Sequence, residues 1–260
     1  MIGQATASLE APPRRWAQRA WGSAYLHRRQ DWRVLWPHLR ALPRTGIRVL
    51  DAGCGPGAWT LELAARRPGW RLVGLDRRPP AAAEDAAARL GLQNAEFHQG
   101  AFLDFAPAEA FDVVLTVHSA HYTFDDGDGA ALFQRFRDWL APGGVLLLLG
   151  PRREPEIPFV RWLPRPRLEY VFTLDALREA CATAGLRIET CAPAIGPLGT
   201  IAKQLDCLAA GPLRRLVLTA GLYPLQLLLV SLDPPRGSPG GASFACLLAA
   251  RAPVLAKERA

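Results

Sequence analysis

The chain has 260 residues, half of them hydrophobic, which excludes an intrinsically disordered protein and provides enough apolar surface for one domain with a large core. The net charge of +7 comes almost wholly from arginine, and without a recognisable nucleic-acid-binding module it favours solvated helix faces, or attraction to an anionic surface or substrate, over nucleic-acid binding. The five cysteines are scattered without a C-x-x-C pair, which argues against disulfides and zinc and favours a reducing cytoplasm.

The N-terminal part is rich in arginine and aromatic residues. We expect two amphipathic helices between about residues 16 and 42, and we interpret residues 1–45 as a helical cap on a single domain that spans 1–260. The paired Arg14 and Arg15 are not followed by an apolar stretch, so a cleaved signal peptide is not expected.

The next predicted element is a short buried strand followed by an acid and three alternate glycines. The strand, Ile47 to Leu50, is β-branched and leucine-rich, as in a strand buried on both faces. The residues that follow it are Asp51, Gly53, Gly55 and Gly57. A helix is expected from Ala58 to Arg67. A strand, a glycine turn and a helix N-terminus together predict a site where a ligand lies against backbone N–H groups.

The spacing of the glycines indicates which ligand this site binds. A dinucleotide site has G-x-G-x-x-G, whereas this chain has G-x-G-x-G with Asp51 two residues before the first glycine. A carboxylate there would repel a pyrophosphate but could hold an ammonium group. A second buried strand, Arg71 to Asp76, ends in an acid placed where such folds bind ribose hydroxyls. The ligand should therefore contain a ribose and a cationic end.

The rest of the chain alternates between helical and strand patterns. Expected helices are Ala81 to Leu90, Gly129 to Leu140, and one between Thr173 and Gly185; expected strands are Ala95 to His98, Phe111 to Val117, one near Val145, Leu186 to Cys191, and Ala242 to Arg251. This order predicts an α/β fold with a doubly wound, mostly parallel, seven-stranded sheet. The ligand should lie at the carboxyl ends of the first two strands.

These motifs resemble those of the class I S-adenosylmethionine-dependent methyltransferases. Asp51 and the three glycines match the first motif of the family, which lines the amino-acid end of the cofactor, and Asp76 matches the acid that binds its ribose. Phe111 to Val117 resembles the fourth strand, and Leu140 to Leu147 resembles the L-x-P-G-G turn into the fifth. The resemblance implies a Rossmann-like methyltransferase fold with an antiparallel last strand, and S-adenosylmethionine as cofactor.

One position departs from the family pattern. Many members have an acid after the third strand that meets the adenine amino group, whereas this chain has Ala101. Adenine recognition then falls to the backbone, to stacking on Phe102, or to Asp104. Ala101, Phe102 and Val117 complete the cofactor-binding residues that we expect.

Candidates for a catalytic base follow the fourth predicted strand. They are His118 and His121, with Tyr122 beside them. Methyl transfer requires mainly an in-line approach of the acceptor and the removal of a proton where the nucleophile carries one. Either histidine could instead shape the pocket, and a carbon or nitrogen acceptor needs no base. The acidic residues between Asp125 and Asp128 are interpreted as a solvated turn, so no metal is expected.

Two segments lie outside this minimal scaffold. Residues 151–167 are rich in proline and arginine, and form either a stiff connector or part of a substrate-facing wall. Residues 196–236 form an apolar helical insertion whose run from 216 to 232 is too short to span a bilayer. It is interpreted as a buried cap helix, a homodimer contact, or a peripheral membrane contact through 214–232 at the inner face of the membrane.

The sequence thus predicts an S-adenosylmethionine-dependent methyltransferase that acts on a small-molecule acceptor. The preferred reaction is O-methylation of a lipid-linked, saccharide or other secondary-metabolite substrate. One alternative is a non-catalytic cofactor-binding or membrane-docked scaffold, which the missing acid at Ala101 supports. Another is a nicotinamide-dependent oxidoreductase, which Asp51 and the absent G-x-G-x-x-G spacing disfavour.

Overall fold

A computed structural model of the protein describes residues 25–125, 127–151, 172–207, 225, 228–233 and 245–254. Several predictions lie outside these residues: the first N-terminal helix, the substrate-facing wall at 152–167, and the apolar run between 216 and 224. The described residues contain no helix that is both long and apolar enough to cross a membrane.

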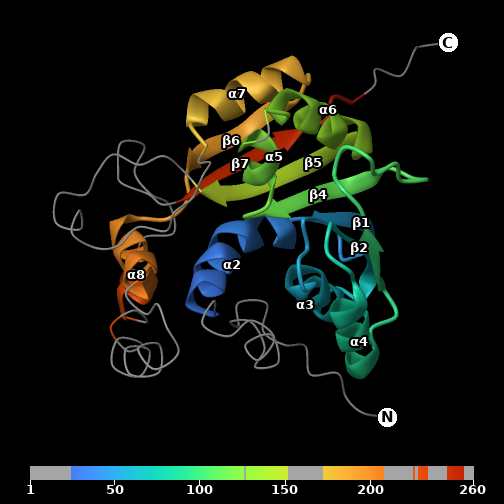
Figure 1. Ribbon diagram of the computed structural model, residues 1–260, viewed down its shortest axis with the longest axis horizontal. Helices are drawn as coiled ribbons and strands as arrows, with labels where there is room; N and C mark the ends of the chain where they lie inside the picture. The colour runs from blue at the N-terminus through green and yellow to red at the C-terminus, as the bar shows by residue number, and fades with distance from the viewer. Residues whose placement is uncertain are drawn as a thin grey trace.

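The centre of the protein is a seven-stranded sheet in the order β3-β2-β1-β4-β5-β7-β6 (Figure 1). The strands are β1 (Thr45–Ala52), β2 (Gly69–Asp76), β3 (Ala95–Gln99), β4 (Phe111–Val117), β5 (Leu140–Pro151), β6 (Arg187–Pro193) and β7 (Ala245–Arg251). Strands β1 to β5 pair in parallel, and β7 is antiparallel to both β5 and β6. The predicted fold class, including the antiparallel last strand, is confirmed.

Helices cover both faces of this sheet. They are α2 (Tyr25–Arg40), α3 (Ala58–Arg66), α4 (Ala81–Leu90), α5 (Ala120–Asp125), α6 (Gly129–Trp139), α7 (Leu174–Thr183) and α8 (Pro197–Cys207). Figure 1 shows α6 and α7 on one face, and α2 and α3 on the other. The short helix α5 was not predicted, and it carries one of the two candidate histidines.

Alternation along the strands explains why their sequences read as continuous apolar runs. In β1, the side chain of Leu50 joins the cluster under α6 and α7, whereas that of Val49 joins the cluster under α2 and α3. The neighbouring strand repeats the pattern with Val114 and Val113. Because both faces are buried at the centre of the sheet, most positions of β1 and β4 are apolar, whereas the edge strands β3 and β6 carry exposed polar residues.

The turn into β5 differs from its prediction. The strand begins at Leu140, earlier than the expected start near Val145. Its pairing with β4 is irregular between those two residues. Gly143 has φ +78°, and a Cβ at Gly144 would lie 2.9 Å from the carbonyl oxygen of Ala141. The Pro-Gly-Gly sequence therefore forms a bulge inside the strand rather than a loop before it.

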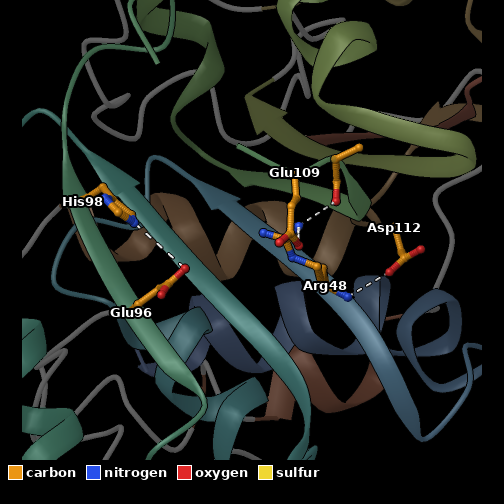
Figure 2. A network of polar contacts seen from close by, with 6 residues as sticks. Arg48, Glu96, His98, Glu109 and Asp112 are labelled. Atoms are coloured by element: carbon orange, nitrogen blue, oxygen red, sulfur yellow. Dashed lines mark hydrogen bonds and ion pairs between the residues drawn. The ribbon is translucent and has the colours of Figure 1, made fainter. Parts of the chain in front are cut away.

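Polar contacts fix the register at the end of the sheet where β4 begins, opposite the carboxyl ends of the strands. The backbone N–H of Arg48 donates to the carboxylate of Asp112 at 2.8 Å, and its guanidinium pairs with Glu109 (Figure 2). The same guanidinium lies 5.1 Å from the centroid of the Phe111 ring. These contacts join β1 to the start of β4. They leave the carboxyl ends of the same two strands open for a site.

Helix α2 packs on the sheet through aromatic side chains. The ring of Trp32 stacks on Trp36 and on Trp59 of α3, with centroid distances of 4.8 and 5.2 Å. The guanidinium of Arg66 lies 4.7 Å from the Trp32 ring and pairs with Glu62 in a buried ion pair. Trp32 and Trp36, two of the aromatic residues interleaved with arginines, therefore belong to the core.

Candidate functional site

A crevice is expected where the strand order reverses. Strand β1 has β2 on one side and β4 on the other, so the connections that leave these strands run in opposite directions. Ligands in such sheets bind outside the carboxyl ends of the strands at this switch point. The residues there are Gly53, just beyond β1, and His118, just beyond β4.

A cavity of about 650 Å³ lies at this switch point, and its size is within the range of small-molecule sites. The cavity brings together most of the residues predicted for binding or catalysis, namely Gly53, Gly55, Asp76, Ala101, Phe102 and His118. Four others, Asp51, Gly57, Val117 and His121, are not among its lining residues. The cavity also includes Arg77 and Arg78, which sequence reasoning missed although they directly follow Asp76.

The three glycines of the turn serve three different purposes, although all have positive φ angles. A Cβ at Gly53 would lie 2.2 Å from the Cβ of Ser119, so this glycine permits close packing of the β1 and β4 ends. A Cβ at Gly57 would lie 2.8 Å from Ala83 and Phe97, so this glycine permits packing of α4 and β3. A Cβ at Gly55 would meet no atom within 4 Å. Gly55 lines the cavity as Gly53 does, but it alone of the two has open space where a side chain would stand.

Asp51 supports the turn from inside the protein. Its side chain is buried, and Oδ2 accepts hydrogen bonds from the backbone N–H and the hydroxyl of Thr60, at 3.1 and 2.7 Å. A carboxylate at the first turn of α3 also interacts favourably with the helix dipole. Burial raises the pKa of the neighbouring Cys54 thiol, and the charges of Asp51 and Asp76 raise it further, so this thiol stays neutral. Contact of Asp51 with an ammonium group stays a prediction.

Asp76 links the ends of β1 and β2. Its Oδ2 accepts from the backbone N–H of Gly55 at 2.8 Å, and its Oδ1 accepts from the N–H of Arg78 at 2.9 Å. A carboxylate has about four lone-pair positions, so two bonds leave capacity for ligand hydroxyls. The two backbone bonds also hold the carboxylate in place on the cavity wall.

The cavity wall formed by the residues after β3 contains both side chains predicted from the sequence as contacts for adenine. Phe102 and Asp104 line it together with Ala101. The Phe102 ring packs against Phe136 of α6 with a centroid distance of 6.4 Å. This packing fixes the plane on which the adenine ring could stack. Stacking on Phe102 and a contact to Asp104 both stay predictions. Val117 is half-buried and packs against the core cluster under α2 and α3.

The two candidate histidines occupy different environments. His118 lines the cavity, and its Nε2 lies 3.2 Å from Oδ2 of Asp31 in α2. His121 is buried, and its ring packs at a tilt against the Tyr122 ring with a centroid distance of 4.0 Å and in a T-shaped arrangement with Phe172. Neither of its ring nitrogens has a hydrogen-bond partner among the described residues. Burial, and secondarily the nearby His118, lowers the pKa of His121 to about 4.

The lowered pKa of His121 makes protein stability depend on pH. The unfolded chain binds a proton at this residue below about pH 6.5, whereas the folded protein does so only near pH 4, so stability falls as pH drops through this window. We expect a loss on the order of 2–3 kcal/mol between pH 7 and pH 4 from this group. Urea unfolding of His121→Phe should show a flatter pH dependence than the wild type. His98→Asn, a change at an exposed histidine, should keep the wild-type slope, and equal slopes for all three proteins would contradict the assignment.

Comparisons with known proteins identify the family. A family model described as a methyltransferase domain matches residues 49–144. The trans-aconitate 2-methyltransferase of Variovorax paradoxus is 32% identical over 182 residues, which cover 67% of this chain and 68% of that protein. The chain belongs to the class I S-adenosylmethionine-dependent methyltransferase family. The matched residues run from β1 into the turn of β5 and include the whole glycine turn.

A second relative and a solved structure of the same fold extend the comparison. The nocamycin O-methyltransferase of Saccharothrix syringae is 36% identical over 174 residues, covering 65% of this chain and 59% of that protein. The chain spans about half the length of most curated relatives that it matches. The crystal structure of the [4+2]-cyclase SpnF shares the fold, with a TM-score of 0.60 and 20% identity over 90% of this chain and 84% of that one.

The residues around the cavity fit S-adenosylmethionine, the cofactor of this methyltransferase family. Gly55 offers backbone with open space beside it, Asp76 offers a carboxylate with unused acceptor positions, and Phe102 offers an aromatic face. Among the described residues, no group of three or more His, Cys, Asp or Glu side chains is arranged to hold a metal ion.

Proposed function

We propose that the protein transfers a methyl group from S-adenosylmethionine to an oxygen atom of a small-molecule acceptor. The observation that carries this proposal is that one cavity contains both the glycine turn with Asp76 and the imidazole of His118. The glycine turn and Asp76 fit the cofactor, and the imidazole of His118 is the base beside it. A relative named as an O-methyltransferase supports an oxygen acceptor.

When bound, S-adenosylmethionine supplies an electrophilic methyl group. The protein has to orient the acceptor and take up its proton, and His118 lies at the cavity wall where it can do so. Ser119 holds this wall together, because its hydroxyl donates to the carbonyl of Ala52 and lies within hydrogen-bond distance of Thr116 Oγ1, both at 2.8 Å. His121 lies near His118 and carries no charge at neutral pH.

The acceptor that we propose is of the saccharide, lipid-linked or secondary-metabolite type. Tyr122, Thr123 and Asp128 line the cavity on the His118 side and offer hydrogen-bonding groups for a polar acceptor. Away from the cavity, Leu225, Leu228 and Leu232 are exposed at helical spacing. This apolar stripe supports a contact of the segment with a membrane interface or with a second copy of the chain.

Incubation with radiolabelled S-adenosylmethionine and fractionated cell extract tests the function. Label should enter small molecules of either the polar or the lipid fraction. Cofactor binding without transfer to any fraction would favour the non-catalytic scaffold. Binding of NADH in place of the methyl donor would favour the oxidoreductase.

Asp76→Ala tests the cofactor part of the site. Loss of a charge-assisted partner should weaken S-adenosylhomocysteine binding by about 1–3 kcal/mol, which is about 5- to 150-fold, in isothermal titration calorimetry. Asp76→Asn keeps one acceptor oxygen and should have an intermediate effect. Asp85→Ala removes an exposed carboxylate from α4 and should bind like the wild type. Wild-type affinity in both Asp76 variants would remove this residue from the binding site.

A further inference from the structure

A buried aspartate in helix α2 contacts the imidazole at the cavity wall. Asp31 is 3% exposed, and its Oδ2 lies 3.2 Å from Nε2 of His118, a residue 87 positions later in the chain. Asp31 also lies outside residues 49–144, which match the methyltransferase domain. The contact therefore adds a residue to the site from a part of the chain that the shared motifs do not include.

Both partners of this contact are held firmly by the protein. On one side, Arg33 anchors α2 by donating to the carbonyls of Val230 and Asp233, at 2.6 and 3.3 Å. On the other, the backbone N–H of His118 donates to the carbonyl of Leu149 in β5 at 2.8 Å. His118 also has φ +53°, the only positive φ of a non-glycine residue among those described. Such backbone strain concentrates at functional sites, where the surrounding structure holds it in place.

The chemistry of the contact determines which ring nitrogen carries the proton. An ionised carboxylate only accepts hydrogen bonds, so Nε2 of His118 must be protonated to bond with Asp31. In the neutral imidazole, the lone pair then lies on Nδ1. Nδ1 makes no hydrogen bond to any of the described residues and can act as the acceptor of a proton.

We propose that Asp31 is a positioning residue that holds His118 in the Nε2–H tautomer, so that Nδ1 removes the proton of the acceptor hydroxyl. This inference rests on the proposed function. The acceptor O–H bond breaks and its proton moves to Nδ1. The oxygen forms a bond to the methyl carbon while the methyl–sulfur bond of the donor breaks, and that electron pair stays on sulfur. Asp31 remains ionised and stabilises the imidazolium that results.

Nuclear magnetic resonance of the 260-residue protein tests the tautomer without any acceptor or cofactor. The protein is labelled with ¹⁵N-histidine, the spectrum is recorded at about pH 8, above the ordinary pKa of histidine, and His118 is assigned by comparison with His118→Asn. The wild type should show His118 protonated at Nε2. In Asp31→Asn the amide can donate to Nε2, and the ring should change to the Nδ1–H form. A wild-type ring protonated at Nδ1, or a variant with an unchanged tautomer, would overturn the proposal.

Turnover provides a second readout, using the extract fraction that accepts label from S-adenosylmethionine. Asp31→Asn should lower the rate of methyl transfer by about 10²- to 10⁴-fold and leave S-adenosylhomocysteine affinity unchanged. In a His118→Asn background it should have no further effect. Gln30→Met changes a buried neighbour in the same helix, and should keep both the tautomer and the rate. An equal loss of rate in Gln30→Met would mean that Asp31 acts only through packing.

The two experiments fail in different ways. If no fraction accepts label, the proposed function is wrong, while the resonance measurement still decides whether Asp31 sets the tautomer. If label is transferred but Asp31→Asn has the wild-type rate, the proposed function stands and the role of Asp31 is wrong. Because the wild-type tautomer alone can overturn the proposal, the test does not depend on correct folding of Asp31→Asn.

Discussion

Gly53→Val is expected to abolish cofactor binding and to destabilise the protein by about 3 kcal/mol or more. A left-handed backbone costs a non-glycine residue about 1–2 kcal/mol, and Gly53 has φ +81°. The new Cβ would also lie 2.2 Å from the Cβ of Ser119 and 3.2 Å from the ring of Phe102. Ser119 can move away only by giving up its bond to the carbonyl of Ala52, at a cost of about 1–3 kcal/mol. Urea unfolding and calorimetric titration with S-adenosylhomocysteine measure both effects.

Alanine at two other glycines controls for the backbone strain in this prediction. Gly55→Ala places its Cβ where no atom lies within 4 Å, so it should cost only the backbone strain while weakening cofactor binding. Gly91→Ala also has positive φ and open space, but it ends α4 away from the cavity. It should lose stability like Gly55→Ala and bind cofactor normally. Wild-type stability and affinity in Gly53→Val would contradict the packing role of this glycine.

Most of the sheet could be predicted from the sequence because its determinants are local. A strand buried on both faces requires a continuous apolar run, and a turn that faces a ligand requires residues that tolerate positive φ, so Val49, Leu50 and Gly55 carry their roles in their own chemistry. The turn into β5 was harder. Pro142 and the two glycines after it indicate a break in regular structure, but they do not distinguish a loop from a bulge within a strand.

The parts of the site that could not be predicted depend on contacts between distant segments. His118 and His121 both follow β4, and only the unexpected helix α5 turns the second one into the core. The contact between Asp31 and His118 joins residues 87 positions apart, with no repeat or motif to indicate the pairing. The sequence shows an acid at position 51. It does not indicate that the backbone N–H and the hydroxyl of Thr60 both donate to one oxygen of Asp51.

The asymmetry between the two histidines also bears on the chemistry. A general base works best when its pKa lies near the operating pH, and the burial that lowers the pKa of His121 to about 4 makes it a weak proton acceptor. His121 also packs between the rings of Tyr122 and Phe172, a position that suits another flat ring. The geometry therefore favours His118, which lines the cavity, as the base, whereas His121 belongs to the aromatic packing beside it.

His118→Asn should lower the rate of methyl transfer by about 10²- to 10⁴-fold, the usual contribution of a positioned base, and leave S-adenosylhomocysteine affinity unchanged. Asparagine is the suitable replacement because it tolerates the left-handed backbone that His118 adopts, so loss of the imidazole is separated from loss of the fold. His121→Phe keeps the aromatic packing but has no base, and should slow the reaction far less. Initial rates with labelled cofactor distinguish the two roles. An equal loss in both variants would make His121 a participant in proton removal, and wild-type rates in both would mean that the acceptor needs no base.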